Sequence, residues 1–554
     1  MPGLYMLDYG AGNVRSLVNA VNHLGYDITF VKEPSDIALA DKLIFPGVGD
    51  FGFAMRALRS KGYAEPLKAY IASGKPFMGI CVGMQTLFEG SAESSEPGLG
   101  IIPGKTLLFD NSTKAVPHMG WNHTQLLKEQ LDNGLEGGQA VNYNIDQDKV
   151  YYFVHSYCAR YSDENKDWVL ATTQYGDETF ISAVQKGNVF ATQFHPEKSG
   201  FAGLNLLKSF ISGTGFVDEK TVICKPPVKL AQDTFTRRII ACLDVRANDS
   251  GDLVVTKGDQ YDVRETEGGK DVRNLGKPVE LAKRYFNEGA DEITFLNITS
   301  FRNCPLADTP MLEVLKLTSK SVFVPLTIGG GIRDVTDPDG TVHPAFEVAG
   351  EYFRFGADKV SIGSDAVYCA EDFIASGGKK NGTTAIETIA EAYGSQAVVI
   401  SVDPRRVYVQ DPKDTPHSTV KNSIPGPNGE QYCWYQCTVK GGREGRDLDV
   451  IQLVTACEQL GAGEILLNCM DRDGTNSGFE LELIDSVKKA VKIPVIASSG
   501  AGRVEDFVEV FEKTGVEAAL AAGIFHRREV PLQNVKEFVK GSGVAVRPID
   551  TTTL

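Results

Sequence analysis

The sequence predicts two α/β domains, a first domain built on a mostly parallel sheet and a second domain that closes into a (βα)8 barrel. Three observations support this prediction. The chain has 554 residues, which is too long for one ordinary hydrophobic core. Apolar strand-like runs alternate with amphipathic helical patterns from the N-terminus onward. The second half carries eight such runs, the number that a closed barrel needs.

The first domain is predicted over residues 1–213. Its segments LYMLDY, VRSLVNAVNHLGY, ITFVK and KLIFPGVG follow in β-α-β-α order, which favours parallel strands. Later strands are expected at PFMGICVG, VYYFVHSY, FISAVQKG and NVFATQFH. Residues 214–236 have few apolar side chains and contain Pro226-Pro227, so this stretch is predicted to be a linker.

The barrel is predicted over residues 237–554. Its expected strands are IIACLDV, EITFLNI, VPLTIGG, KVSIGSD, VVISVDP, EILLNCM, IPVIASS and AALAAGI. Three pairs repeat in order: IIACLDVR with VVISVDPRR, GADEITFLNIT with GAGEILLNCMD, and VPLTIGGGIRD with IPVIASSGAGRVED. This half-barrel duplication predicts two equivalent catalytic positions and two equivalent phosphate sites.

Composition excludes several classes of protein. The net charge of −16 argues against a nucleic-acid binder, and no apolar run is long enough for a membrane span. The N-terminus lacks a signal-like segment, so we expect a cytoplasmic protein whose ten cysteines, including Cys433 and Cys437, are reduced thiols. There is no metal-ligand spacing and no dinucleotide-binding fingerprint, so neither a metal nor a cofactor is expected.

The segment PFMGICVGMQ contains the first catalytic candidate. Cys81 follows a predicted strand, lies between Gly79 and Gly83, and precedes a helix. Small neighbours permit the sharp turn of a nucleophile elbow, and a helix N-terminus stabilises a thiolate. The alternative is a buried thiol at the end of a strand.

The segment NVFATQFHPEKSG supplies partners for that thiol. His195 can act as a general base and then protonate the leaving amine. Glu197 can orient the imidazole and stabilise its cation. A lone His before Pro is usually a loop residue, but together with Cys81 the pattern indicates a catalytic triad.

These motifs, GICVGMQ and FHPEKS, resemble the class I glutamine amidotransferase family over the whole first domain. The resemblance implies that Cys81 attacks the glutamine amide, that a thioester forms, and that water releases glutamate. It also implies that Gln85 contacts bound glutamine and that the loop containing Gly47 and Gly49 forms the oxyanion hole. Glycines suit that loop because they let backbone N–H groups approach the substrate.

In the barrel, Asp244 and Asp403 end the first and fifth strands. Active sites of such barrels lie at the C-terminal ends of the strands, so the two carboxylates are expected to face each other and to share acid and base chemistry. The alternative for a single Asp of this kind is a turn or helix cap.

Glycine-rich strand ends indicate phosphate binding, because backbone N–H groups and helix N-termini hold anions. The strand-end candidates are Gly330, Gly331, Gly363, Ser364, Ser499, Gly500, Ala522 and Gly523. Lys257, in the loop after the first strand, is a further candidate, with a solvated loop lysine as the alternative.

Charged residues stand where four barrel strands begin: Arg238, Glu292, Lys359 and Glu464. Strand starts lie at the face opposite the active site, where two cations and two anions can form a ring of salt bridges. Ordinary stabilising ion pairs are the alternative. A pair between Lys198 and Asp358 is expected if the first domain covers this face.

Nearly the whole second domain resembles the cyclase part of the imidazole glycerol phosphate synthase family, enzymes of histidine biosynthesis. The matching stretches are RRIIACLDVR, VVTKGDQ, GADEITFLNITS, TIGGGIRD, GADKVSIGSDAV, DPRRV, GAGEILLNCMDRDGTNSG and IPVIASSGAG. The joined domains resemble the single-chain form of fungi and plants.

The resemblance implies that ammonia from glutamine reacts with a bis-phosphorylated phosphoribulosyl-formimino aminoimidazole carboxamide ribotide. The implied products are imidazole glycerol phosphate and aminoimidazole carboxamide ribotide. Asp244 and Asp403 become the acid/base pair, Asp473 binds substrate or orders the active-site loop, and the ring becomes an ammonia gate. Asn297 stands where many relatives carry Asp, and the insertion 408–442 has no counterpart in shorter bacterial forms.

Three alternatives stay open at this point. A barrel isomerase acting on a related phosphorylated substrate would share the duplication but would not need the first domain. An inactive scaffold would not need an intact triad. A glutaminase could also deliver ammonia to another acceptor, which only the barrel motifs oppose. Because both domains are in one chain, a monomer is expected.

Overall fold

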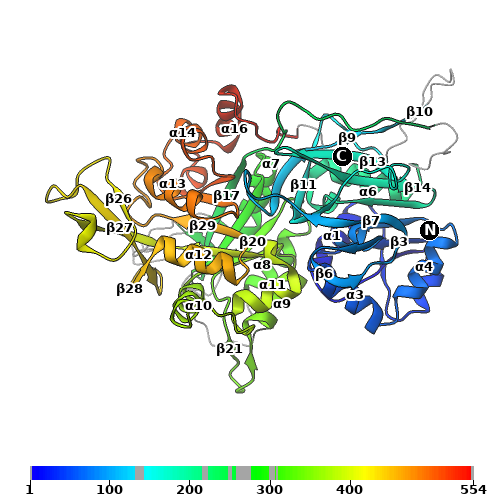
Figure 1. Cartoon of the computed structure of the whole chain (residues 1–554), viewed down its shortest axis with the longest axis horizontal. Coiled ribbons are helices and arrows are strands. Elements are labelled where there is room, and N and C mark those ends of the chain that lie inside the picture. Colours follow the sequence, from blue (N-terminus) through cyan, green and yellow to red (C-terminus); the bar gives the residue numbers. More distant parts are fainter. Residues whose placement is uncertain are drawn as a thin grey trace.

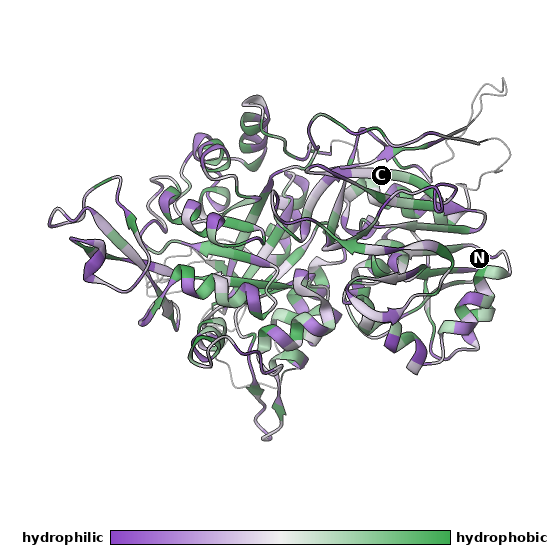
Figure 2. Cartoon of the chain, in the orientation of Figure 1, coloured by the Kyte–Doolittle hydropathy of each residue, from purple (hydrophilic) through white to green (hydrophobic). Residues whose placement is uncertain are grey.

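The computed structural model describes residues 3–130, 143–214, 222–247, 253–256, 276–298, 306 and 310–550. The N-terminal domain and the barrel lie side by side, and the C-terminal end of the chain returns from the barrel to the N-terminal domain (Figure 1). Apolar residues concentrate in the central strands and on the inner faces of the helices (Figure 2). Among the described residues, no helix has the length and apolar character required to cross a membrane.

The N-terminal domain contains an eight-stranded sheet in the order β2-β1-β3-β4-β15-β14-β13-β9. Its parallel half consists of β2 (Thr29–Phe30), β1 (Leu4–Met6), β3 (Lys42–Phe45), β4 (Phe77–Ile80) and β15 (Val189–Thr192). Its antiparallel half adds β14 (Glu178–Lys186), β13 (Val169–Tyr175) and β9 (Gln125–Leu126).

The predicted mostly parallel sheet is confirmed for β2, β1, β3, β4 and β15, but the prediction did not include the antiparallel strands of its second half. Short glycine turns at Gly176 and Gly187 join β13 to β14 and β14 to β15, and such turns can connect only antiparallel strands. The helices α1 (Val14–His23), α3 (Phe51–Ser60), α4 (Ala64–Ala72) and α6 (Gly200–Ser212) accompany the parallel half, as βαβ units require.

The predicted eight-stranded barrel is confirmed. Its strands are β17 (Arg238–Ala247), β19 (Glu292–Asn297), β20 (Leu326–Gly329), β23 (Lys359–Ile362), β24 (Val398–Val402), β29 (Glu464–Asn468), β30 (Val495–Ser498) and β31 (Ala518–Ala521). The barrel closes where β31 pairs in parallel with β17. Its surrounding helices include α7 (Pro278–Asn287), α8 (Pro310–Thr318), α9 (Ala345–Arg354), α10 (Ser364–Ala375), α11 (Ala385–Tyr393), α12 (Val450–Leu460), α13 (Leu481–Ala490), α14 (Val504–Thr514) and α16 (Leu532–Gly541).

The predicted linker packs against the N-terminal domain. Its strand β16 (Val222–Cys224) pairs with β10 (Lys128–Gln130), and the Leu230 backbone N–H donates to Gln174 Oε1 at 2.6 Å. The insertion after the fifth barrel strand forms a small sheet of β25 (Pro404–Val409), β26 (Thr419–Lys421), β27 (Tyr432–Val439) and β28 (Glu444–Asp449), which projects from the end of the barrel far from the N-terminal domain (Figure 1).

Candidate active sites

Cys81 occupies a strained elbow between β4 and the short helix α5 (Val82–Gln85). Its φ of 53° lies in the left-handed region that non-glycine residues rarely adopt. The flanking glycines are sterically required, since a Cβ at Gly83 would lie 2.0 Å from the Phe45 carbonyl oxygen and one at Gly79 2.8 Å from the Gly83 carbonyl oxygen. The Cys81 backbone N–H donates to the Thr192 carbonyl at 2.7 Å, which fixes the elbow beside the end of β15.

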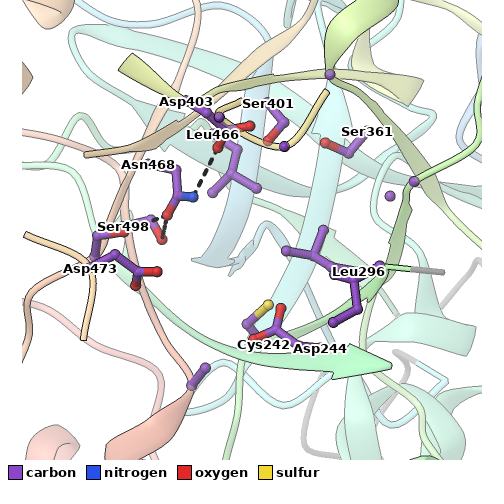
Figure 3. Close-up of a pocket in the computed structure, with 18 of the residues that line it drawn as sticks. Cys242, Asp244, Leu296, Ser361, Ser401, Asp403, Leu466, Asn468, Asp473 and Ser498 are labelled. Atoms are coloured by element: carbon purple, nitrogen blue, oxygen red, sulfur yellow. Dashed lines mark hydrogen bonds between the residues drawn. The ribbon is translucent and has the colours of Figure 1, made fainter. Parts of the chain in front are cut away.

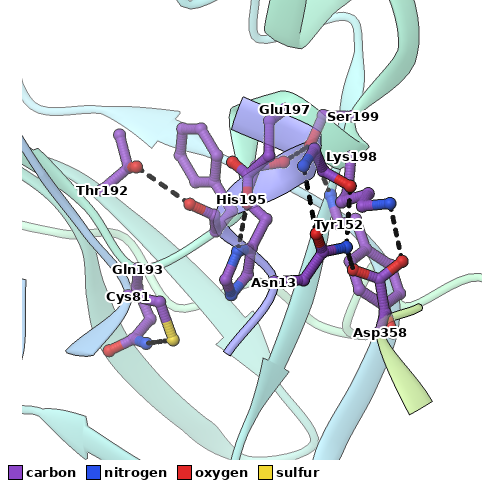
Figure 4. Close-up of polar contacts among 12 residues, drawn as sticks. Asn13, Cys81, Tyr152, Thr192, Gln193, His195, Glu197, Lys198, Ser199 and Asp358 are labelled. Atoms are coloured by element: carbon purple, nitrogen blue, oxygen red, sulfur yellow. Dashed lines mark hydrogen bonds and ion pairs between the residues drawn. The ribbon is translucent and has the colours of Figure 1, made fainter. Parts of the chain in front are cut away.

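His195 follows the end of β15 and is buried beside Cys81 (Figure 4). Its Nδ1 lies 2.7 Å from Glu197 Oε1. Burial opposes a charge on His195, but the nearby charges and hydrogen bonds of Glu197 and Cys81 raise its pKa well above the usual value. A cationic imidazole next to Sγ stabilises negative charge on the sulfur, so the three predicted residues form one arrangement suited to nucleophilic catalysis.

The loop that contains Gly47 and Gly49 adjoins this nucleophile. The Val82 N–H, beside the nucleophile, donates to the Gly47 carbonyl at a long 3.4 Å. The Tyr9 hydroxyl donates to the Val48 carbonyl at 2.9 Å. A Cβ at Gly49 would lie 3.1 Å from the Ala392 carbonyl oxygen, so the loop abuts the C-terminal end of α11 in the barrel.

Two polar residues near this loop escaped prediction from the sequence. Gln193 contacts the sulfur of Cys81, and Glu93 accepts a hydrogen bond from the Phe51 N–H at 2.9 Å. Burial, with a smaller contribution from Asp50, raises the pKa of Glu93 to about 8. Neither residue belongs to a spacing pattern, although Gln193 lies two positions before His195 in the motif itself.

The C-terminal ends of the barrel strands surround a cavity of about 580 Å³. Asp244 and Asp403 lie on opposite walls of it, as the duplication predicts (Figure 3). The cavity is also lined by Asn297, Asp473 and the predicted phosphate-binding residues Gly330, Gly331, Gly363, Ser364, Ser499, Gly500, Ala522 and Gly523. Lys257 lies outside the described residues.

The two carboxyl groups have different surroundings. Burial, and then the charge of Asp473, raises the pKa of Asp244 to about 7. Burial also raises the pKa of Asp403, but Asn468 Nδ2 donates to its Oδ1 at 2.9 Å and opposes this increase. Two buried carboxyl groups with unequal support for their charged forms can serve as an acid and a base.

The glycine-rich strand ends are close-packed backbone turns. Gly330 has a φ of 91°, and a Cβ there would lie 2.2 Å from the Asn297 carbonyl oxygen. Gly500 has a φ of 98°, and a Cβ there would lie 2.3 Å from the Gly478 carbonyl oxygen. Ser364 begins the twelve-residue helix α10 directly behind one of these ends. These turns line the cavity at repeat-related places, and backbone N–H groups at such turns and at a helix N-terminus favour anions.

The predicted salt-bridge ring is confirmed at the opposite face of the barrel. Arg238 pairs with Glu292 at 2.8 Å and with Glu464. Lys359 pairs with Glu292 at 2.7 Å and with Glu464 at 2.6 Å, which closes the ring. All four side chains are buried, and the oxygens of Glu292 also accept from Thr327 Oγ1 at 2.6 Å.

The N-terminal domain covers this ring. Met119, in β8 (His118–His123), places its Sδ 3.6 Å from Lys359 Nζ. Tyr152, in β11 (Val150–His155), is buried where the charges of Glu292 and Arg238 act on it. These two strands therefore cover the ring. Lys198 pairs with Asp358 at 2.6 Å, as predicted (Figure 4). The residue after Glu197 is thereby joined directly to the start of β23.

A strained Cys with a His–Glu pair, placed over the ring-closed end of a (βα)8 barrel, defines a glutamine amidotransferase coupled to a second active site. The comparisons agree. Residues 5–212 match the model described as "Glutamine amidotransferase class-I", and residues 238–531 match "Histidine biosynthesis protein".

Full-length relatives extend this result. The chain is 58% identical to "Imidazole glycerol phosphate synthase hisHF" of Emericella nidulans, over 99% of both chains. It is 55% identical to the protein named "Imidazole glycerol phosphate synthase hisHF, chloroplastic" of Arabidopsis thaliana, over 98% of this chain and 89% of the relative. The chain belongs to the imidazole glycerol phosphate synthase family, in its single-chain form.

Proposed function

We propose that this enzyme hydrolyses glutamine at Cys81 and uses the ammonia in its barrel to form imidazole glycerol phosphate and aminoimidazole carboxamide ribotide. The observation that carries the proposal is the placement of two candidate active sites on either side of one buried ring of charges. Family membership supplies the identity of the bis-phosphorylated acceptor. The cavity with its two glycine-rich cradles suits that molecule.

In the first reaction, Cys81 Sγ attacks the side-chain carbonyl carbon of glutamine. His195 transfers a proton to the departing nitrogen, which leaves as ammonia, and Glu197 stabilises the imidazolium before that transfer. Water activated by His195 then cleaves the thioester and releases glutamate. Val82 N–H supports the oxyanion once the Gly47 carbonyl has moved away from it.

In the second reaction, ammonia adds to the acceptor between Asp244 and Asp403. Asp244, whose pKa is about 7, donates a proton, and Asp403, whose carboxylate is held by Asn468, removes one. The glycine-rich cradles hold the two phosphates and so fix the reacting atoms between these carboxyl groups. Burial is the main cause of the raised pKa of Asp244, and the charge of Asp473 raises it further.

Replacing Lys359 with Met is expected to uncouple the two reactions. The ring loses one cation, so Glu292 and Glu464 each keep only Arg238, and opening of this face lets ammonia escape to solvent. Glutamate formation should continue while product formed per glutamate falls below one. The variant should also lose about 3 kcal/mol of stability, because a buried ion pair is broken.

Lys536→Met is the matched control for that variant. Lys536 is also buried and pairs with Asp291 at 2.6 Å, but it lies outside the ring. The control should lose comparable stability and keep one product per glutamate. A Lys359→Met enzyme with the same stoichiometry as this control would contradict an ammonia route through the ring.

Replacing Asp473 with Asn is expected to move the pH dependence of the cyclase reaction. Removing a negative neighbour makes ionisation of Asp244 easier and lowers its pKa from about 7, so the protonated acid is lost at a lower pH. Because burial is the larger cause, the shift should be about half a unit. The kcat/KM profile at a constant concentration of free ammonia measures it, and an unmoved alkaline limb would contradict the assignment of Asp244 as the acid.

Glutaminase activity with and without a nucleotide ligand tests the proposed function. Stimulation by the bis-phosphorylated acceptor or by imidazole glycerol phosphate, absent in Cys81→Ala, is the expected result. A high basal glutaminase activity that neither ligand changes would indicate a different ammonia acceptor. The absence of a cofactor, the monomeric state and the cytoplasmic location remain predictions from the sequence.

A further inference from the structure

A chain of side-chain amides leads from a backbone carbonyl to the nucleophile. Gln85 Nε2 donates to the Tyr157 carbonyl oxygen at 3.0 Å and to Gln193 Oε1 at 3.1 Å. Gln193 Nε2 in turn donates to Cys81 Sγ at 3.4 Å (Figure 4). The chain thus joins three segments, α5, the end of β15 and β12 (Tyr157–Ala159), at the sulfur atom.

The Tyr157 carbonyl determines which amide group of each glutamine donates and which accepts. A backbone carbonyl can only accept, so the group that Gln85 directs at Tyr157 must be its NH2. The same NH2 group contacts Gln193, which must therefore present its oxygen to Gln85. Gln193 is left with its own NH2 group facing Cys81, and the reverse orientation would place two donors against each other.

Gln193 is held rigidly in this position. Its side chain is fully buried, and its backbone N–H donates to the Ser182 carbonyl at 2.8 Å. The preceding residue, Thr192, accepts the backbone N–H of Cys81 at 2.7 Å, so donor and sulfur are fixed to the same strand end. Cys81 and Gln193 are both buried, and at a buried position an N–H donated to a negatively charged atom forms a stronger hydrogen bond than it does in solvent.

We propose that Gln193 is a further catalytic residue of the glutaminase, which orients Cys81 Sγ for attack and stabilises its thiolate with an amide N–H. This inference rests on the proposed glutaminase reaction. The N–H is donated while the charge resides on sulfur. As the S–C bond forms, the charge moves to the substrate oxygen and the Gln193 bond weakens.

The same chain gives Gln85 a second task. Both N–H groups of Gln85 are engaged by Tyr157 and Gln193, and no described residue donates to its Oε1. The family resemblance assigns Gln85 to bound glutamine, and this oxygen can accept a hydrogen bond from that substrate. Contact with substrate at Gln85 is then relayed to the nucleophile through Gln193.

The test compares Gln193→Leu and Gln193→Glu with the unmodified full-length enzyme, in the presence of the stimulating nucleotide. Leu removes both amide functions, and glutaminase kcat should fall about 10- to 100-fold, the effect of losing a donor to a charged group. The glutamine KM should change by less than about threefold, because the loss falls on the chemical step. Glu keeps the shape and the acceptor for Gln85 but lacks the donor, so its loss should be at least as large.

A second readout does not depend on turnover. Alkylation of Cys81 by a diazoketone analogue of glutamine, followed by mass spectrometry, should slow by a similar factor in both variants. The control is Gln174→Leu, since Gln174 is also buried and donates to the backbone carbonyls of Gly176 in the same domain and of Leu230 in the linker. It should lower thermal stability but leave kcat within about twofold.

Activity and alkylation within twofold of the unmodified enzyme in either Gln193 variant would overturn the inference and leave the proposed function intact. A Gln193→Glu enzyme that keeps full activity while Gln193→Leu loses it would show that shape alone matters, which also overturns it. If the unmodified enzyme released no glutamate with glutamine and the nucleotide, the proposed function itself would fail.

Discussion

Cys81→Ala is expected to lower glutaminase activity by about 10⁴-fold or more, because among the described residues only Cys81 places a thiol beside His195 and Glu197, where it can form the thioester. The barrel should remain active with ammonium salts as the nitrogen source, since Asp244 and Asp403 lie at the far end of the barrel. Glutamate release and ammonia-dependent product formation are measured on the same preparation. The substitution does not relieve the backbone strain at position 81, because Ala is as restricted as Cys at a φ of 53°.

Cys158→Ala is the control for this change. Cys158 is a free, fully buried thiol on β12 of the same domain, so the substitution removes an equally buried sulfur. It should leave glutaminase activity close to that of the unmodified enzyme. Residual glutamine hydrolysis of equal size in both variants would exclude Cys81 as the nucleophile.

Asp244→Asn is expected to lower ammonia-dependent cyclisation by about 10²- to 10⁴-fold, the usual contribution of a general acid. Asn matches the shape of Asp and carries no charge. Because burial already disfavours the charged form of Asp244, the variant should be at least as stable as the parent. Asp403→Asn should have a cyclase effect of similar size, and both variants should still hydrolyse glutamine in response to the nucleotide.

Asp485→Asn provides the matched control on α13, where Asp485 is partly exposed and pairs only with Lys489 in the described ion pairs. Its cyclase rate should be unchanged, because surface pairs of this kind contribute little. A cyclase rate within tenfold of the parent in both Asp244→Asn and Asp403→Asn would remove these residues from the acid/base role.

The periodic parts of the fold could be predicted because local sequence determines them. Each barrel strand carries a mainly apolar run, and the internal repeat shows which strand ends are equivalent. The equivalence of Asp244 and Asp403 therefore follows from the sequence alone. The antiparallel half of the first sheet was missed. Its turns are short and contain glycine, but an apolar run in the sequence does not show whether the neighbouring strand is parallel or antiparallel.

The triad residues could also be predicted from the sequence. A strained elbow requires small neighbours, so the nucleophile is marked by the motif GICVG. Gln193 and Glu93 were not, because a single buried amide or carboxyl group carries no spacing signal. Their roles depend on which strands and loops come together around Cys81, and that is a property of packing across more than a hundred residues of chain.

Residue type and spacing were enough to predict the two domains, the duplicated barrel, the triad residues and the four charges that begin the barrel strands, because they encode strands, turns and charge. The closing of those charges into a ring beneath Met119 and Tyr152, the contact of the Gly47 carbonyl with the Val82 N–H, and the direction of the Gln193 N–H toward the sulfur could be read only from the folded chain. Hydrogen-bond direction and the closing of an ion-pair ring instead depend on atoms brought together from distant segments.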